Sequence, residues 1–194
     1  SWDDPIELQR LDFPTAFSTQ VKKLAESIAA STRQPAGRLD VTACTLMTID
    51  NPGTLDRDDG LTVEVLGAGR LKIGIHITDA TDLIPIDSKI DIEASRRMST
   101  LYTPDMRIPM VPKIICDDAG SLLAGETRMA LTLFTTLGDG RVLDWELTPS
   151  VIKAVDALTY EQVDDTLRAG EGHRLVDLQA LDSAAQALRR TRQA

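Results

Sequence analysis

The stretch that decides the fold runs from Leu61 to Ile77 and reads LTVEVLGAGRLKIGIHI. Apolar and polar residues alternate over 61–66 and again over 71–77, a pattern typical of strands with one buried face. Between the two runs stands Gly67-Ala-Gly-Arg70, and glycine supplies the backbone freedom that a tight turn needs. The sequence therefore predicts a β-hairpin over 61–77.

The same alternation recurs downstream in 128–136 and 141–148, on either side of Gly138-Asp-Gly140. This pattern predicts a second hairpin. A β-prone run over 41–49 precedes the first hairpin and predicts a further strand.

Helices are expected around and between the hairpins. Apolar residues recur at helical spacing from Pro14 to Ala30, and an Asp12 before a Pro14 is typical of a helix start. The other expected helices cover 88–98, about 160–168 and 174–193, whereas three prolines exclude a regular helix in 103–112. The expected fold class is α+β, with β-hairpins or a mixed sheet, flanking helices and a preceding N-terminal helix. We expect two segments, a helical segment with a linker over 1–37 and a main domain over 38–194.

The composition is that of an ordinary soluble domain. Of the 194 residues, 42% are hydrophobic and 26% are charged, which excludes a disordered acidic tail and a fibrous repeat. The two cysteines, Cys44 and Cys116, cannot form a disulfide framework and favour a reducing compartment. Neither a signal peptide nor a long apolar run is recognisable, so we expect a cytoplasmic protein without a membrane partner.

The net charge is −9, from 30 acidic and 21 basic residues. Such a balance argues against a passive nucleic-acid binder, whose affinity depends on Lys and Arg. It does not exclude an enzyme that reaches phosphate through bound cations, because clustered carboxylates hold such cations.

Four aspartates lie within ten positions: Asp50, Asp56, Asp58 and Asp59. Without cations these carboxylates would repel one another, since like charges raise each other's pKa. One interpretation is a solvated acidic loop. Placement favours a metal site instead, because Asp50 ends one predicted strand and Asp59 begins another.

Two familiar metal sites do not fit this cluster. An EF-hand frame starting at Asp56 places Leu61 where glycine is required, and a frame starting at Asp50 places Leu55 there. Zinc is disfavoured because His76 and His173 are far apart in sequence. Hard oxygen ligands favour Mg²⁺, with Mn²⁺ as the alternative, and such ions serve in-line displacement at phosphorus.

The aspartates open a longer ordered series that resembles the catalytic domain of the ribonuclease II and ribonuclease R (RNB) family. The series comprises Thr48-Ile-Asp50 with Asp56-Arg-Asp58-Asp59, then Gly74-Ile-His-Ile-Thr-Asp79, 90–97, Tyr102-Thr-Pro104, Ile108-Pro-Met-Val-Pro112, Ser121-Leu122, Arg128 and Leu158-Thr-Tyr-Glu-Gln-Val163. Order and spacing hold from about residue 38 to residue 194. Each piece is weak alone, but the series is specific.

The resemblance implies a metal-dependent, processive 3′→5′ exoribonuclease that hydrolyses single-stranded RNA to nucleoside 5′-monophosphates. Carried over residue by residue, Asp50, Asp56 and Asp59 become metal ligands. Asp58 joins the metal site as the aspartate whose loss stops cleavage. Physically, some carboxylates would hold the cation while one positions or deprotonates the water.

Four further residues match the series. Tyr102 matches the tyrosine that stacks near the 3′-terminal nucleotide, and Tyr160 matches a position linked to ribose recognition; either could instead be structural. His76 lies on an alternating strand and is expected to be structural. Arg97 could position a carboxylate or phosphate, or form a helix-surface salt bridge.

The resemblance covers only the first half of the family's catalytic domain, here 38–194. Arginines and a glutamate from the second half, and S1-type RNA-binding domains, would be partners outside these residues. Gly60 also stands where the family usually has alanine. We therefore expect the 194 residues alone to be weak or inactive.

Two other function classes stay open. The first is a catalytically inactive RNB-like module that binds RNA or a partner protein. The second is a structural Ca²⁺-binding domain, which predicts a filled coordination sphere, whereas catalysis predicts open positions facing a cleft.

Overall fold

A computed structural model describes residues 14–31, 36–103 and 106–193. Packing divides these residues into two units, each discontinuous in sequence. One unit combines 14–31 with Ala80–Ser121, and the other combines 36–79 with 122–193. The expected division at residue 37 stays a sequence-based proposal.

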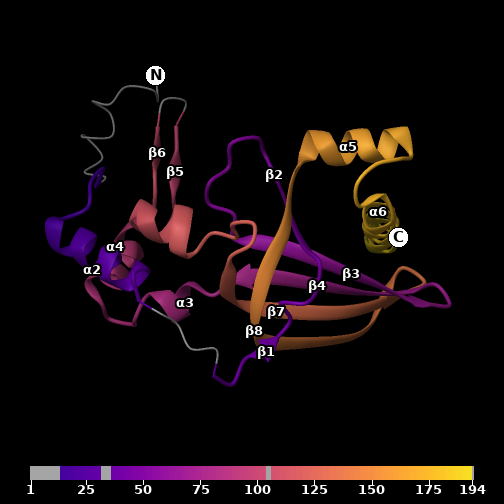
Figure 1. The fold of residues 1–194 in the computed structure, drawn as a ribbon, viewed down its shortest axis with the longest axis horizontal. Helices are drawn as coiled ribbons and strands as arrows, with labels where there is room; N and C mark the ends of the chain where they lie inside the picture. The colour runs from indigo at the N-terminus through magenta and orange to yellow at the C-terminus, as the bar shows by residue number, and fades with distance from the viewer. Residues whose placement is uncertain (1–13, 32–35, 104–105, 194) are drawn as a thin grey trace. The chain divides into compact units, whose positions relative to one another are not determined.

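The larger unit is built on one mixed sheet. Its strands are β1 (Leu39–Asp40), β2 (Leu46–Asp50), β3 (Asp59–Gly67), β4 (Arg70–Thr78), β7 (Thr127–Gly138) and β8 (Arg141–Thr159). Their order is β1-β8-β2-β3-β4-β7, and β7 pairs with β8 as well (Figure 1). The pairings β2-β3-β4-β7-β8 and back to β2 therefore form a closed ring.

The length of β8 makes this ring possible. Its first part pairs antiparallel with β7 as far as Lys153, and its last part, from Ala154 to Thr159, pairs in parallel with β2. Because one strand serves two neighbours in succession, it joins the second hairpin to the strand that precedes the first.

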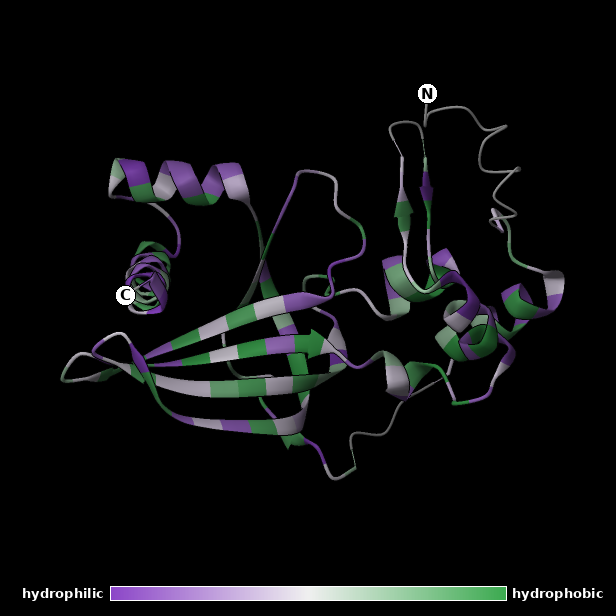
Figure 2. Ribbon diagram, turned by 180° about the vertical axis from the view of Figure 1, so that it is seen from behind, coloured by the Kyte–Doolittle hydropathy of each residue, from purple (hydrophilic) through white to green (hydrophobic). Residues whose placement is uncertain are grey.

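Both predicted hairpins are confirmed. In β3–β4, Asp59 lies opposite Ile77 and Val65 opposite Leu71, and the turn residues Gly67 and Gly69 have φ of 80° and 70°. The β7–β8 turn likewise has positive φ at Asp139 and Gly140. Figure 2 shows hydrophobic and hydrophilic residues alternating along these strands.

The predicted strand over 41–49 is too long at its start. It begins only at Leu46, because Asp40 turns the preceding chain: its Oδ1 accepts hydrogen bonds from the backbone N–H and hydroxyl of Thr42. The N–H of Cys44 then donates to the carbonyl of Val41, which closes the turn.

The two predicted C-terminal helices are confirmed as α5 (Tyr160–Ala169) and α6 (Leu175–Gln193). Thr159 and Gln162 form a capping box that starts α5, and Gly170 ends it with φ of 68°. Helix α6 packs on the sheet, where Ala184 joins Ile73 and Leu137 in a buried cluster. None of the helices in the described ranges combines the length and apolar character needed to cross a bilayer.

The side of the sheet opposite the α6 cluster carries a chain of buried polar side chains. Nε2 of His76 lies 2.9 Å from the Thr62 hydroxyl, and its Nδ1 lies 2.8 Å from the Thr132 hydroxyl. The Thr132 and Ser150 hydroxyls are 2.5 Å apart. A Cβ at Gly74 would come within 2.4 Å of Thr62 Oγ1, so this position accepts only glycine without a shift. The chain links four strands and shows that His76 is structural, as expected.

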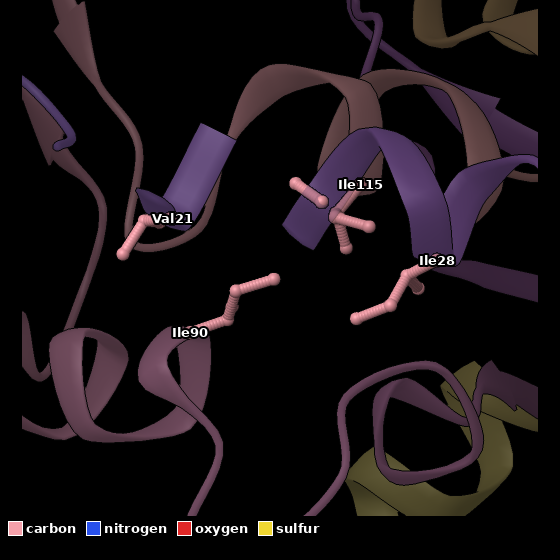
Figure 3. Close-up of a cluster of buried hydrophobic side chains, with 5 residues drawn as sticks. Val21, Ile28, Ile90 and Ile115 are labelled. Carbon is pink, nitrogen blue, oxygen red and sulfur yellow. The ribbon is translucent and has the colours of Figure 1, made fainter. Parts of the chain in front are cut away.

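The smaller unit is mainly helical. It contains α2 (Thr19–Ala29), α3 (Ala80–Leu83), α4 (Lys89–Arg97), β5 (Leu101–Tyr102), β6 (Arg107–Ile108) and a π-helix (Ile114–Ala119). Figure 3 shows Val21, Ile28, Ile90 and Ile115 pointing toward one another in its core. The helix predicted over 88–98 is confirmed as α4, and 103–112 holds no helix among its described residues.

The start of the first predicted helix is wrong. Helix α2 begins at Thr19 rather than Pro14, because the Ser18 hydroxyl accepts a hydrogen bond from the Val21 N–H and caps the helix there. Asp12, the other predicted start signal, lies outside the described residues.

The polar chain should contribute measurably to stability. In Thr132→Val, the hydroxyl between His76 and Ser150 is lost, and both partners lose a buried contact. We expect the free energy of unfolding in urea to fall by about 1–3 kcal/mol, the cost of unsatisfied buried polar groups. Thr127→Val, at an exposed position of the same strand, should change it by less than about 0.5 kcal/mol. Equal effects of the two substitutions would contradict this role of the chain.

Stability should also fall in acid through His76. Burial lowers the pKa of this imidazole from 6.5 to about 4. Between these values the unfolded chain binds a proton that the folded chain does not, so the contribution is complete above pH 6.5 and is lost as pH falls toward 4. The full loss is about 3 kcal/mol. We expect His76→Asn to flatten the dependence of unfolding free energy on pH in this window, and an NMR titration of His76 with a midpoint above 6 would refute the argument.

Candidate active site

The aspartate cluster lies where β2 ends and β3 begins. Asp50 is the last residue of β2 and Asp59 the first of β3, and the two strands are antiparallel neighbours. Asp56 and Asp58 lie in the connecting loop. The structure therefore brings the four predicted site residues to one end of the closed sheet, where β2 stops and β3 starts.

Backbone hydrogen bonds anchor the connecting loop. The carbonyl of Arg57 accepts from the N–H of Leu122 at 2.7 Å, and the carbonyl of Asp58 accepts from the N–H of Thr78 at 2.8 Å. Earlier in the loop, the N–H of Thr54 donates to the carbonyl of Asn51. Successive loop residues are thus fixed to two segments of the larger unit, which holds their side chains in place.

Gly60 lies at a close approach just behind this loop. A Cβ at Gly60 would meet Leu46 Cδ2 at 2.6 Å and the Met47 carbonyl oxygen at 3.2 Å. Alanine, the residue that the family resemblance suggests here, would need the end of the Leu46 side chain to move. Glycine thus lets β2 and β3 pack closely beside Asp59.

The carboxylates influence one another electrostatically. Burial raises the pKa of Asp50, and Asp58 and Asp56 add to the rise, while the Thr48 hydroxyl and Arg57 oppose it. Burial also raises the pKa of Asp59, with further contributions from Asp58 and Asp50. Four acidic groups therefore share one site, and a bound cation would reduce the unfavourable electrostatic energy of their charges.

Arg57 is a member of this site that the sequence reasoning did not single out. Its Nε lies 3.7 Å from Oδ2 of Asp50, and both side chains are mostly buried. The available signal was its position between Asp56 and Asp58, since a cation within an acidic run is placed to neutralise its neighbours.

The donor set fits a hard divalent cation by its chemistry. Carboxylate oxygens are the ligands that Mg²⁺ and Mn²⁺ prefer. Burial, with a smaller contribution from the neighbouring aspartates, raises the pKa of Asp50 and Asp59, and a bound cation would offset both effects. Within the described ranges, no three His, Cys, Asp or Glu side chains converge as a ready-made metal-binding group. The four aspartates are therefore candidate ligands without a preformed coordination geometry.

The two predicted substrate-binding tyrosines lie in different units. Tyr160 starts α5 directly after Thr159, which pairs with Asp50, so the tyrosine follows the strand end beside the aspartates. Its side chain is 56% exposed. Tyr102 is 65% exposed on β5 of the smaller unit, opposite Arg107. Both side chains are accessible to a ligand.

Arg97 forms a salt bridge along its helix with Glu93, as one of the two alternatives expected, but its side chain is buried rather than on the helix surface. Its Nη2 donates to Oε1 of Glu93 and to the Ala16 carbonyl, both at 2.9 Å, and its guanidinium lies 3.9 Å from the centre of the Phe17 ring. Arg97 thus joins α4 to the chain before α2. Periodicity could not reveal this, since the partners come from a distant segment.

The comparisons with known proteins agree with the sequence resemblance. The family described as RNB domain matches residues 38–194. The human 3′-5′ exoribonuclease HELZ2 is 30% identical over 180 residues, covering 89% of this chain and 6% of the relative. Ribonuclease R of Thermotoga maritima is 33% identical over 172 residues, covering 86% of this chain and 24% of the relative. The chain thus spans a quarter or less of the length of these relatives.

Solved structures show the same fold. Mycoplasma genitalium RNase R, in complex with ribose-methylated single-stranded RNA, matches with a TM-score of 0.88 at 22% identity, over 96% of this chain and 30% of that chain. Yeast Ssd1, described as a pseudonuclease, matches with a TM-score of 0.68 at 23% identity, over 90% of this chain and 20% of that chain. The predicted fold class is confirmed.

The expectation drawn from the ordered motifs is thereby confirmed at the level of the family. The match extends over most of the chain and includes all four aspartates, the β2–β3 edge and both C-terminal helices. The chain belongs to the RNB domain family.

Proposed function

We propose that this chain forms the metal-binding part of a 3′→5′ exoribonuclease that hydrolyses single-stranded RNA to nucleoside 5′-monophosphates, with Mg²⁺ as the cofactor and Mn²⁺ as an alternative. The observation that carries the proposal is the group of four aspartates at the β2–β3 edge, two of them with raised pKa. Membership of the RNB family and relatives named as exoribonucleases support it. The chain spans a quarter or less of these two relatives, and we propose that further catalytic residues and S1-type domains outside these residues act as its partners.

The aspartates would divide the work as follows. Asp50, Asp56 and Asp59 provide carboxylate oxygens for the cation, and Asp58, the more exposed loop residue, positions and deprotonates the attacking water. The bound cation would supply Lewis-acid activation of the scissile phosphate and of the water. Arg57 neutralises part of the charge on Asp50, which lets a phosphodiester approach an otherwise acidic edge.

The exposed tyrosines would contact the RNA. An aromatic face stacks on any base, which suits an enzyme indifferent to sequence, and we assign this role to Tyr102. Tyr160, beside the Asp50 strand end, would contact the ribose, where the 2′-hydroxyl distinguishes RNA from DNA. Processive action and a cytoplasmic location complete the proposal.

Cleavage should depend on Asp58. We expect the Asp58→Asn variant of the longest natural form of the protein to degrade a 5′-labelled single-stranded RNA at a rate lower by roughly 10²–10⁴-fold in Mg²⁺, since a general base is lost. Asp144→Asn, on the exposed part of β8, removes the same charge and should leave the rate of RNA shortening unchanged. If the unmodified protein binds the RNA but does not shorten it in Mg²⁺ or Mn²⁺, the inactive binding module would be favoured instead.

Metal binding should be visible in stability without any cleavage. At tenfold excess over its dissociation constant, Mg²⁺ should stabilise the folded chain by about 1.4 kcal/mol. Asp59→Asn should show a higher melting temperature than the unmodified chain in EDTA, because a partly buried charge is removed and its repulsion from Asp58 and Asp50 is relieved. It should gain less from Mg²⁺, because a ligand is lost.

Calorimetry in EDTA and in Mg²⁺, with Asp144→Asn as the control, measures both effects. A solvated acidic loop predicts no Mg²⁺ effect that differs between the two variants. A structural Ca²⁺ site predicts stabilisation by Ca²⁺ and none by Mg²⁺.

A further inference from the structure

One end of the larger unit carries an arginine-lined groove that plays no part in the site described above. It is a cavity of about 480 Å³ between the tip of the β7–β8 hairpin and the last turns of α6. Arg141 comes from the hairpin, and Arg189 and Arg192 come from the helix. We call this cavity, with its three arginines, the arginine groove.

The groove is built into the fold. The hydroxyl of Thr191 donates to the carbonyl of Gly140 at 3.0 Å, which fastens the hairpin tip to α6. Gly140 has φ of 69°, and a Cβ there would meet Thr191 and Ala187 at 3.1–3.4 Å. Leu188 belongs to the cluster that packs α6 on the sheet, so the apolar floor of the groove continues into the core.

Within the described ranges, seven arginines form an ion pair with a carboxylate, whereas the three groove arginines form none. Arginines with an ion pair are Arg38, Arg57, Arg97, Arg107, Arg128, Arg168 and Arg174. Among the described residues, no carboxylate forms an ion pair with Arg141, Arg189 or Arg192. In a chain with 30 acidic against 21 basic residues, this local excess of positive charge favours an anionic ligand.

Arg70 extends the same positive region. It follows the turn of the β3–β4 hairpin, and its Cγ would lie 3.4 Å from a Cβ at Gly138, at the tip of the neighbouring hairpin. Arg70 also has no carboxylate partner among the described residues. The two hairpin tips lie at the same end of the sheet (Figure 1). Arg70 follows one turn and Arg141 the other, so both tips add positive charge there.

The groove and the aspartates lie at opposite ends of the same strands. Strand β3 begins at Asp59 and ends at Gly67, which pairs with Arg70. At about 3.3 Å per residue, its two ends are about 26 Å apart. A ligand that reached both ends would be a chain of several linked units, as a polynucleotide is.

We propose that the arginine groove binds phosphates of the RNA at a distance from the aspartate site and so retains the substrate between cleavage events. The inference rests on the proposed function, because it takes RNA as the substrate. Guanidinium groups bind phosphate through paired hydrogen bonds, and the apolar floor formed by Val142 and Leu188 suits an unstacked base. Without metal, the carboxylates beside Asp50 repel phosphates, so an arginine site elsewhere would supply affinity that the cleavage site lacks.

The test measures binding of a fluorescein-labelled single-stranded oligouridylate in EDTA, where no metal-dependent cleavage occurs, with the protein in its natural length. In the variant Arg141→Gln, Arg189→Gln, Arg192→Gln, we expect the dissociation constant to rise roughly tenfold. The slope of the logarithm of the association constant against the logarithm of the salt concentration should become shallower by about 2. The reason is that three phosphate contacts are lost from a single strand. An unchanged slope and affinity would overturn the proposal.

Matched variants separate local from general effects. Gln substitutions at Arg96, Lys153 and Arg168 remove the same charge at exposed positions elsewhere and should leave the slope unchanged. Lysine at the three groove positions keeps the charge and should preserve the slope, which excludes a folding defect. If the salt dependence became equally shallow in the control variant, the proposal would be overturned, because the change would then result from the lower net charge of the protein.

Two further arms distinguish this inference from the proposed function. Asp58→Asn prevents cleavage but keeps the three groove arginines, so the groove substitutions should raise the dissociation constant by the same factor in this background as in the unmodified protein. RNA cleavage that needs Asp58, together with a groove variant of normal affinity, would overturn the groove and leave the nuclease proposal intact. A protein that does not bind RNA would overturn both. Poly-glutamate that binds more tightly than RNA, and loses affinity in the groove variant, would replace RNA by an acidic protein partner.

Discussion

The parallel pairing of β2 with the end of β8 is the interaction on which the larger unit depends. It closes the ring of strands, and without it the two hairpins would form an open sheet with β2 at its edge. It also sets the register that places Asp50 opposite Thr159, and so brings the end of β2 beside the start of α5. Loop 51–58 runs from this fixed point to β3, and hydrogen bonds from Leu122 and Thr78 hold its second half.

Buried polar side chains form part of the interior of this closed sheet, beside an apolar cluster of Leu46, Leu122, Ala130, Ile152 and Ala154. His76, Thr62, Thr132 and Ser150 satisfy one another across four strands, so burial costs them little hydrogen bonding. Gly74 leaves the space that the imidazole needs. Since a hydrogen-bonded network tolerates only one arrangement, it fixes strand register more strictly than an aliphatic filling would.

Local patterns predicted much of this structure, and the limits have a physical cause. Alternation and glycine-rich turns determine hairpins between neighbouring segments, so 61–77 and 128–148 were predicted correctly. The β2–β8 pairing and the ring join residues far apart in sequence, and no single-sequence period encodes them. The burial of Arg97 depends on such contacts too, with Ala16 and Phe17. The ion pair of Arg57 with Asp50 depends instead on the conformation of the loop between β2 and β3, which strand alternation does not describe.

The late position of Thr159 has a consequence for how the protein is made. During synthesis, Asp50 and the loop after it leave the ribosome long before the strand that must flank them. The first hairpin can form at once, since its contacts are local, but β2 stays an unpaired edge on one side until the end of β8 emerges. The aspartate cluster is thus completed only after β8 has emerged, and until then the nascent chain holds its acidic loop without the finished site.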